Sequence, residues 1–212
     1  MDRVSAQPKL DRGYGKIAKK LGRLYGQYRA ATAHDPISEP NKVGDLDAYF
    51  DPKSDFSVQR VALHGKPIWF AAVDRTTVEV GDYFVGENGT WFIGSMQDLA
   101  PTMAVKCNAV ASLFRPGVGM PNPYYPEAGG GEVATLTAWP ISFLEGTKGE
   151  RSALNNPLDT RTPWFDVLMP VFGSLDVRTH DRLRLDDGTE WVISSPELTE
   201  LGWRLTCGLV TA

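Results

Sequence analysis

The sequence has few of the residues that build metal and redox sites, with two cysteines and three histidines among 212 residues. Cys107 and Cys207 have no second Cys or His at metal-ligand spacing, which excludes a zinc site and a CxxC redox pair. His34, His64 and His180 match no H-E-x-x-H or comparable pattern. We therefore expect no metal and no cofactor. Each cysteine is predicted to be a small buried residue on an equivalent strand, although a disulfide between them is geometrically conceivable.

Catalytic motifs are absent as well. The stretch "GYGKIAKKLG" has the glycines of a phosphate loop, but it lacks the G-x-x-x-x-G-K-[ST] order and no strand precedes it. Ser95 and Ser195 lie outside any G-x-S-x-G elbow and have no histidine near them in the sequence. The acidic stretch "DLDAYFDPKSD" lacks the ligand spacing and central glycine of a calcium loop. We expect that the protein is not an enzyme.

Long hydrophobic runs and long periodic helices are also scarce. No apolar run approaches the roughly 20 residues that span a bilayer, and no signal peptide opens the chain, so we expect a protein made in a cytoplasm, without a membrane. Glycine (21) and proline (15) are frequent, which favours short strands joined by tight turns. The chain has room for two cores of about 80 to 100 residues each. These features predict a mainly β protein with two tandem small β-barrel or sandwich units and an N-terminal amphipathic helix.

Positive charge is scarce except at the start of the chain. Residues 1–30 hold eight Lys or Arg and two Asp, a charge of +6, so the remainder carries −10 within a net charge of −4. The stretch "YGKIAKKLGRLYGQYR" predicts a helix with an apolar stripe opposite a basic face. The stripe packs on its own domain or docks on a neighbouring protein, and the basic face contacts DNA phosphates, an acidic protein or solvent. The stripe comprises Ile17, Leu21, Leu24, Tyr25 and Tyr28, and the cations are Lys16, Lys19, Lys20 and Arg23.

Composition divides the chain into five segments. Residues 1–31 form the basic helix, and residues 32–55, rich in Pro, Asp and Asn, are predicted to be an extended arm that reaches over a neighbour. Short apolar runs in residues 56–114 and 133–212 form two β units. The Pro/Gly-rich residues 115–132 are predicted to link these units.

The two β units repeat one pattern. The stretches "VEVGDYFVGENGTWFIGS" and "VRTHDRLRLDDGTEWVISS" align at an offset of 99 residues up to the turn and of 100 residues after the inserted Glu190. We interpret this as an internal duplication in which Asp accepts backbone N–H bonds, Gly makes the hairpin turn, and Trp and Ile face the core. The repeated positions are Asp82, Gly89, Trp91 and Ile93 in the first unit and Asp181, Gly188, Trp191 and Ile193 in the second, and the offset of 100 also matches Cys107 to Cys207.

Both stretches resemble the neck proteins of tailed bacteriophages, the head–tail connector or head-closure components between portal and tail. The likeness rests on the order "GD, apolar strand, DGT, W-x-I, final strand" and covers about two thirds of the chain. It implies a structural virion protein, made in the bacterial host cytoplasm, that forms a homo-oligomeric ring beside portal, neck or tail proteins and close to packaged DNA. Such connectors commonly have one barrel, whereas two are predicted here. A tail or baseplate component remains an alternative, as does a carbohydrate or host-surface binding module in which Tyr124 and Tyr125 stack on a sugar.

Overall fold

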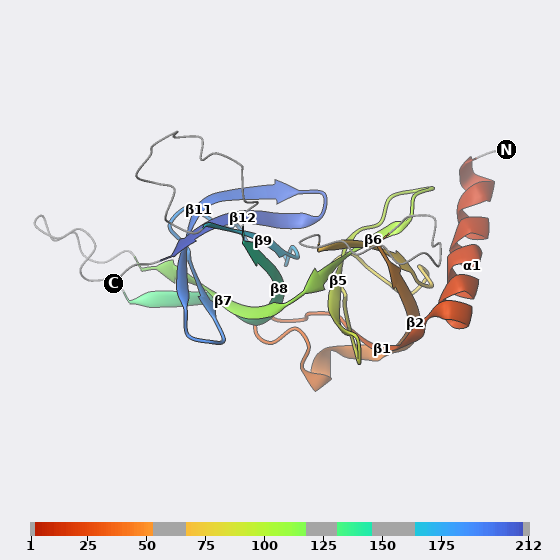
Figure 1. Cartoon of the computed structure of the whole chain (residues 1–212), viewed down its shortest axis with the longest axis horizontal. Coiled ribbons are helices and arrows are strands. Elements are labelled where there is room, and N and C mark those ends of the chain that lie inside the picture. The colour runs from red at the N-terminus through yellow and green to blue at the C-terminus, as the bar shows by residue number, and fades with distance from the viewer. Residues whose placement is uncertain (1–2, 53–66, 118–130, 146–163, 210–212) are drawn as a thin grey trace, which may run out of the picture.

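The computed structural model describes residues 3–52, 67–117, 131–145 and 164–209. These residues form one α-helix at one end of the long axis and two barrels of strands side by side (Figure 1). The helix is α1 (Arg3–Leu21), and a short 3-10 helix, η1 (Glu39–Asn41), precedes the second strand. The strands are β1 (Arg23–Tyr28), β2 (Lys42–Asp51), β3 (Ile68–Ala72), β4 (Tyr83–Gly86), β5 (Gly89–Ser95), β6 (Thr102–Cys107), β7 (Ala109–Pro116), β8 (Glu132–Glu145), β9 (Trp164–Met169), β10 (Arg182–Leu185), β11 (Glu190–Thr199) and β12 (Gly202–Leu209).

The two barrels have the same topology. The first closes in the order β1-β2-β3-β6-β5-β4, and the second closes in the order β7-β8-β9-β12-β11-β10. All of the strand pairs are antiparallel, including the closing pairs β1 with β4 and β7 with β10. Strand for strand the orders match, so the duplication extends over the whole barrel. The prediction of a mainly β protein with two tandem barrel units and an N-terminal helix is confirmed.

The repeated tryptophans occupy equivalent places in the two cores. Trp91 on β5 stacks on Phe50 of β2, with ring centroids 4.4 Å apart. Trp191 on β11 contacts Phe143 of β8, the strand equivalent to β2, at 5.1 Å. Both tryptophans are buried. Burial of a large aromatic side chain stabilises the folded state by about 2 to 3 kcal/mol, so each tryptophan anchors its barrel.

The N-terminal helix ends earlier than the sequence pattern indicates. It stops at Leu21, and Leu24 and Tyr28 lie on β1 instead of continuing a helical stripe. Gly22 explains the change, because a Cβ there would lie 2.3 Å from the Ala18 carbonyl oxygen and 2.7 Å from that of Ala48. Only glycine allows the chain to pass so close to β2.

The segment boundaries also differ from those predicted. Residues 42–51 of the expected arm form β2 of the first barrel, and β7, expected in the first unit, belongs to the second. The described ends of the expected linker, residues 115–117 and 131–132, continue the pairing of β7 with β8 within one barrel. The barrels are joined instead at Asn108, the single residue between β6 and β7. The polar composition of β2, and the stretch "AVKCNAVASLF", in which β6 passes into β7 with only Asn108 between them, hid these boundaries.

The residue before each repeated Asp provides a test of the duplication. Gly81 and His180 both have positive φ, +93° and +73°, and both donate their N–H to the carbonyl of the repeated Ile. Strain of about 1 to 2 kcal/mol at His180 exceeds the entropic cost of glycine, about 0.5 to 1 kcal/mol. We expect His180→Gly to raise the free energy of unfolding by about 0.5 to 1 kcal/mol, and Gly81→Ala to lower it by about 1 kcal/mol, in urea denaturation. Shifts of the same sign in both variants would contradict the equivalence.

Candidate functional site

An arginine–aspartate pair with a buried carboxylate is repeated in the two barrels. Arg29 Nε and Nη2 donate to the two carboxylate oxygens of Asp82 at 2.7 and 2.8 Å. Arg115 binds Asp181 in the same way, at 3.0 and 2.8 Å. Arg29 directly follows the first strand of its barrel, Arg115 lies one residue before the end of the equivalent strand, and each aspartate directly precedes the fourth strand. The pair, here called the barrel clamp, therefore bridges the two strands whose pairing closes the barrel.

The clamp accounts for the repeated aspartates as structural residues. Asp82 and Asp181 are buried, and each also accepts a backbone N–H three residues earlier in the chain, from Glu79 at 2.9 Å and from Arg178 at 2.8 Å. The carboxylate hydrogen bond raises the pKa of the arginine in each pair, so the guanidinium stays charged. The sequence predicts the turn-like acceptor role of the aspartates. It does not reveal the arginines, because their offset of 86 residues differs from that of the aspartates.

The two barrels meet at a buried seam. Tyr83 on β4 is fully buried, and its hydroxyl donates to the Pro140 carbonyl oxygen of β8 at 2.9 Å. Its ring contacts Trp139 at 6.1 Å. Trp139 in turn donates its indole N–H to the Ala33 carbonyl at 2.8 Å, so the β1–β2 connection also crosses to the second barrel. The described part of the expected arm therefore contacts the second barrel of its own chain.

The β11–β12 turn provides a further contact across the seam. Gln97 donates to Glu200 at 2.7 Å. A Cβ built on Gly94 of β5 would lie 3.1 Å from the Leu201 side chain, which shows how closely the turn covers β5. The turn thus extends from the second barrel onto the first and covers one side of the space between the two barrels.

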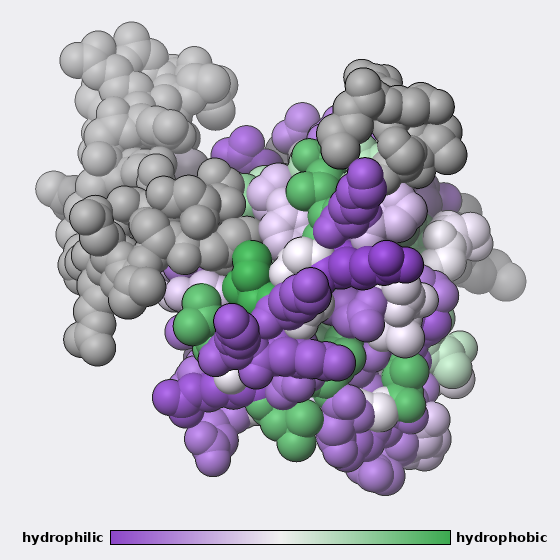
Figure 2. All heavy atoms as spheres, turned by 90° about the vertical axis from the view of Figure 1, so that its right-hand side faces the viewer, coloured by the Kyte–Doolittle hydropathy of each residue, from purple (hydrophilic) through white to green (hydrophobic). Residues whose placement is uncertain are grey.

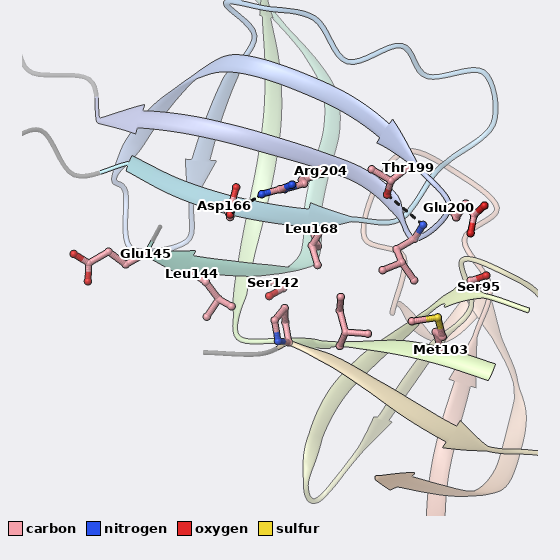
Figure 3. Close-up of a pocket in the computed structure, with 13 residues that line it drawn as sticks. Ser95, Met103, Ser142, Leu144, Glu145, Asp166, Leu168, Thr199, Glu200 and Arg204 are labelled. Atoms are coloured by element: carbon pink, nitrogen blue, oxygen red, sulfur yellow. Dashed lines mark hydrogen bonds and ion pairs between the residues drawn. The ribbon is translucent and has the colours of Figure 1, made fainter. Parts of the chain in front are cut away.

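A pocket of about 590 Å³ lies under this roof (Figure 3). Its volume falls in the range of small-molecule sites, about 300 to 1,000 Å³, which often occur between domains. The second barrel contributes the outer faces of β8, β9 and β12, and the first contributes β3, β5 and β6. The apolar part of the lining comprises Pro67, Ile68, Met103, Leu144, Leu168 and Leu201.

The polar part of the lining is acidic. Arg204 pairs with Asp166 at 3.2 Å, and the second carboxylate oxygen of Asp166 is buried without a hydrogen-bond partner. Glu145 and Glu200 also line the pocket, so its formal charge is −2. This lining favours a cation over an anion. Of the lining residues, Ser95 alone is singled out by the sequence pattern, since the pocket is assembled from strands far apart in the sequence.

The basic residues of α1 form a continuous stripe on its outer side. Lys16, Lys19 and Lys20, singled out in the sequence, are exposed, as are Lys9 and Arg12, which precede the periodic stretch that begins at Tyr14. At about 100° per residue, these five side chains fall within a third of the helix circumference. None of the five forms an ion pair with a described residue. We call this set the α1 stripe.

The remaining predicted contact residues are divided between several surroundings. Arg23 lies on β1 and pairs with Glu87 at 3.4 Å across an exposed edge. Leu21 and Leu24 are exposed, at 51% and 65%. Tyr28 packs against the core of the second barrel, and Ile17 is half-buried. The predicted apolar stripe is therefore not one continuous helical surface.

The cysteines lie on equivalent strands but at different positions. Cys107 pairs with Thr90, whereas Cys207 pairs with Ile193, because the β11–β12 hairpin is longer than its counterpart. Both thiols are free, and burial raises the pKa of both, to about 12 for Cys207. Among the described residues, no group of three or more His, Cys, Asp or Glu is placed to hold a metal ion. No described helix is long and apolar enough to span a membrane.

The two clamps differ in what remains when the arginine is removed. Asp82 keeps a hydrogen bond from Gln27 at 2.7 Å, which has no counterpart at Asp181. Removing one partner of a buried pair costs about 3 to 5 kcal/mol, and the partial exposure of both arginines lowers this cost. We expect Arg115→Met to lower the free energy of unfolding by about 2 to 4 kcal/mol, and Arg29→Met by less. Chemical denaturation of both variants measures the order, and a larger loss in Arg29→Met would contradict it.

The seam is tested at the Tyr83 hydroxyl. Removal of this hydroxyl leaves the Pro140 carbonyl without a partner in a buried setting, at a cost of about 1 to 3 kcal/mol. We expect Tyr83→Phe to lower the free energy of unfolding by that amount, while the chain still unfolds in one transition. Tyr28→Phe is the matched control, since that hydroxyl has no hydrogen bond to a described residue. Equal stability of the two variants, measured by thermal denaturation, would argue against the seam contact.

Comparisons of the chain with protein-family models, with curated proteins and with solved structures give no match. The described residues present four features that bear on function: the clamp, the seam, the pocket and the α1 stripe. The clamp and the seam hold the fold together, whereas the pocket and the stripe are surfaces open to a partner.

Proposed function

We propose that this chain is a structural assembly protein of a tailed bacteriophage, a head–tail connector or neck component that forms a homo-oligomeric ring between portal and tail. The observation that carries the proposal is the tandem pair of small closed barrels, each with a hairpin in which Asp, Gly-Thr and W-x-I follow in order, preceded by Gly in the first unit and His in the second, and whose sequence resembles connector proteins. The chain acts as a building block of the virion, and its function is to bind neighbouring subunits through its surface and not to catalyse a reaction.

The closed barrels suit assembly through side-chain surfaces. A closed barrel has no free strand edge, so copies cannot associate by adding strands to a sheet. The two barrels are joined by one residue and a buried seam, so the subunit presents its faces at fixed positions. A head-to-tail contact between such subunits closes into a ring when its rotation divides a full turn.

The burial of the tryptophans favours this function over a carbohydrate-binding module. Sugar recognition commonly uses an exposed aromatic ring as a stacking platform. All six tryptophans of the chain lie in the described residues, and none is exposed. The tyrosines considered for stacking, Tyr124 and Tyr125, lie outside the described residues. A tail or baseplate component shares the same building-block chemistry and differs only in its place in the particle.

Mass photometry and negative-stain imaging of the purified full-length chain test the proposal. We expect a closed ring of about six to twelve copies, because heterologous contacts that close give one defined copy number. The control is the same chain at increasing salt, which separates assembly through charge from assembly through apolar contacts.

A monodisperse 23.3 kDa monomer at all concentrations would contradict ring formation by the chain alone. Electron cryomicroscopy of purified particles then decides between neck and tail. Density for the tandem barrels between portal and tail supports the neck, and density at the baseplate supports the alternative.

A further inference from the structure

The α1 stripe faces away from the barrel because the opposite side of the helix is fixed to it. Ala18 is buried at the contact with the first barrel, and α1 packs on β2 and β3. Gln7 accepts the backbone N–H of Leu99 at 2.7 Å, and Asp11 lies 3.7 Å from Arg75. These residues lie about half a turn around the helix from the stripe. The five cations are therefore held together on the outer surface, where α1 forms one end of the molecule (Figure 1).

The charge of the molecule is separated in space. Residues 3–21 hold six Lys or Arg and one Asp, whereas the other described residues hold ten Lys or Arg and twenty Asp or Glu. The helix thus carries +5 beside a body of −10. Figure 2 looks at the α1 end, and this face is mostly hydrophilic, with hydrophobic residues in separate spots. A polyanion approaching the molecule is attracted to this end and repelled by the rest.

We infer that the α1 stripe binds the phosphate backbone of a nucleic-acid duplex without sequence preference. From Lys9 to Lys20 the stripe is about 16 Å long, at 1.5 Å per residue. Duplex DNA carries one charge per 1.7 Å of its axis, or about ten over that length. Four of the five cations are lysines, whose ammonium groups act as point charges on phosphate and need no fixed geometry. The inference goes beyond the proposed ring and stands whether or not the chain assembles.

A lipid surface fits the stripe less well. An interfacial helix binds by burying its apolar face in the bilayer, with its basic residues alongside. In α1 the less polar side, with Tyr14 and Ala18, is already in contact with the barrel. Apart from the exposed Leu21 at its end, the helix therefore offers a lipid surface mainly charge.

A protein partner also fits the stripe less well. Interface centres are enriched in aromatic residues, Met and Arg and depleted in Lys. The α1 stripe has four lysines, one arginine and no aromatic residue. Its composition matches phosphate contacts, in which cations position the protein on the backbone without reading the bases.

Fluorescence anisotropy of the full-length chain with a labelled 20-base-pair DNA duplex tests the inference. We expect a dissociation constant in the low micromolar range at 50 mM NaCl and the same affinity for an unrelated duplex sequence. The logarithm of the association constant should fall with the logarithm of salt concentration with a slope of about −4, since each phosphate contact contributes about −0.9.

Two triple variants with the same net charge separate the stripe from overall charge. The stripe variant is Lys16→Gln, Lys19→Gln and Lys20→Gln, and the control replaces three exposed or half-buried cations outside α1. We expect the stripe variant to lose at least tenfold in affinity at 50 mM NaCl, with a slope of about −2, and the control to stay within about twofold. Thermal denaturation checks that both variants fold. The control substitutions are Lys42→Gln, Arg178→Gln and Arg182→Gln.

Three outcomes overturn the inference. The first is no binding of the duplex at 50 mM NaCl, and the second is equal loss in the two triple variants. The third is preference for another anion, measured as displacement by poly-glutamate at equal charge concentration or as tighter binding to vesicles containing phosphatidylserine. The ring is scored separately by mass, so a stripe variant that still assembles but releases DNA supports the inference independently of the proposed function.

Discussion

The fold depends on a wall of the first barrel that is apolar on both faces. Phe84 and Trp91 point into the first core, while Tyr83 and Phe92 point outward and join the core of the second barrel. Alone, the first barrel would expose this outer layer to water, at about 25 cal/mol for each Å² of apolar surface. The seam removes that cost and places the hydrogen bond from Tyr83 to Pro140 in a dry setting. The position of the pocket and the rigidity of the subunit both follow from this contact.

The outer wall of the second barrel differs from the equivalent wall of the first. In the second barrel Arg182 and Arg184 occupy the positions of Tyr83 and Val85. They pair with Glu132 on that outer wall, and burying these ions against a third barrel would cost their hydration. The two barrels thus share one core pattern. They differ on the outer face of the equivalent wall, which is buried in the first barrel and exposed to solvent in the second.

The parts of the fold that the sequence predicts are those with local chemistry. A turn glycine, a tryptophan two or three residues later and an alternating strand identify each hairpin, because turn type and side-chain alternation are set by neighbouring residues. β1 was not predicted, since Leu24 and Tyr28 fit a helical stripe as well as a strand, and the choice depends on the close approach at Gly22. Lys16, Lys19 and Lys20 were found from composition, whereas the clamp and the pocket join residues from distant strands and leave no local pattern.

The placement of α1 follows from the same tandem packing. The wall formed by β4 to β6 of the first barrel packs on β8 of the second, and β8 is equivalent to β2. α1 covers β2 and β3 of the first barrel. The helix therefore occupies the same face of the first barrel that, on the second barrel, is covered by the first barrel. In tandem repeats the end units need a polar outer face, because their outer side has no neighbour to cover it. α1 provides this polar face at one end through the α1 stripe, and Arg182 and Arg184 provide it on the outer wall of the second barrel. Both ends carry cations. Among the described residues, glutamates pair with those of the arginine wall, whereas the cations of the α1 stripe have no such partners.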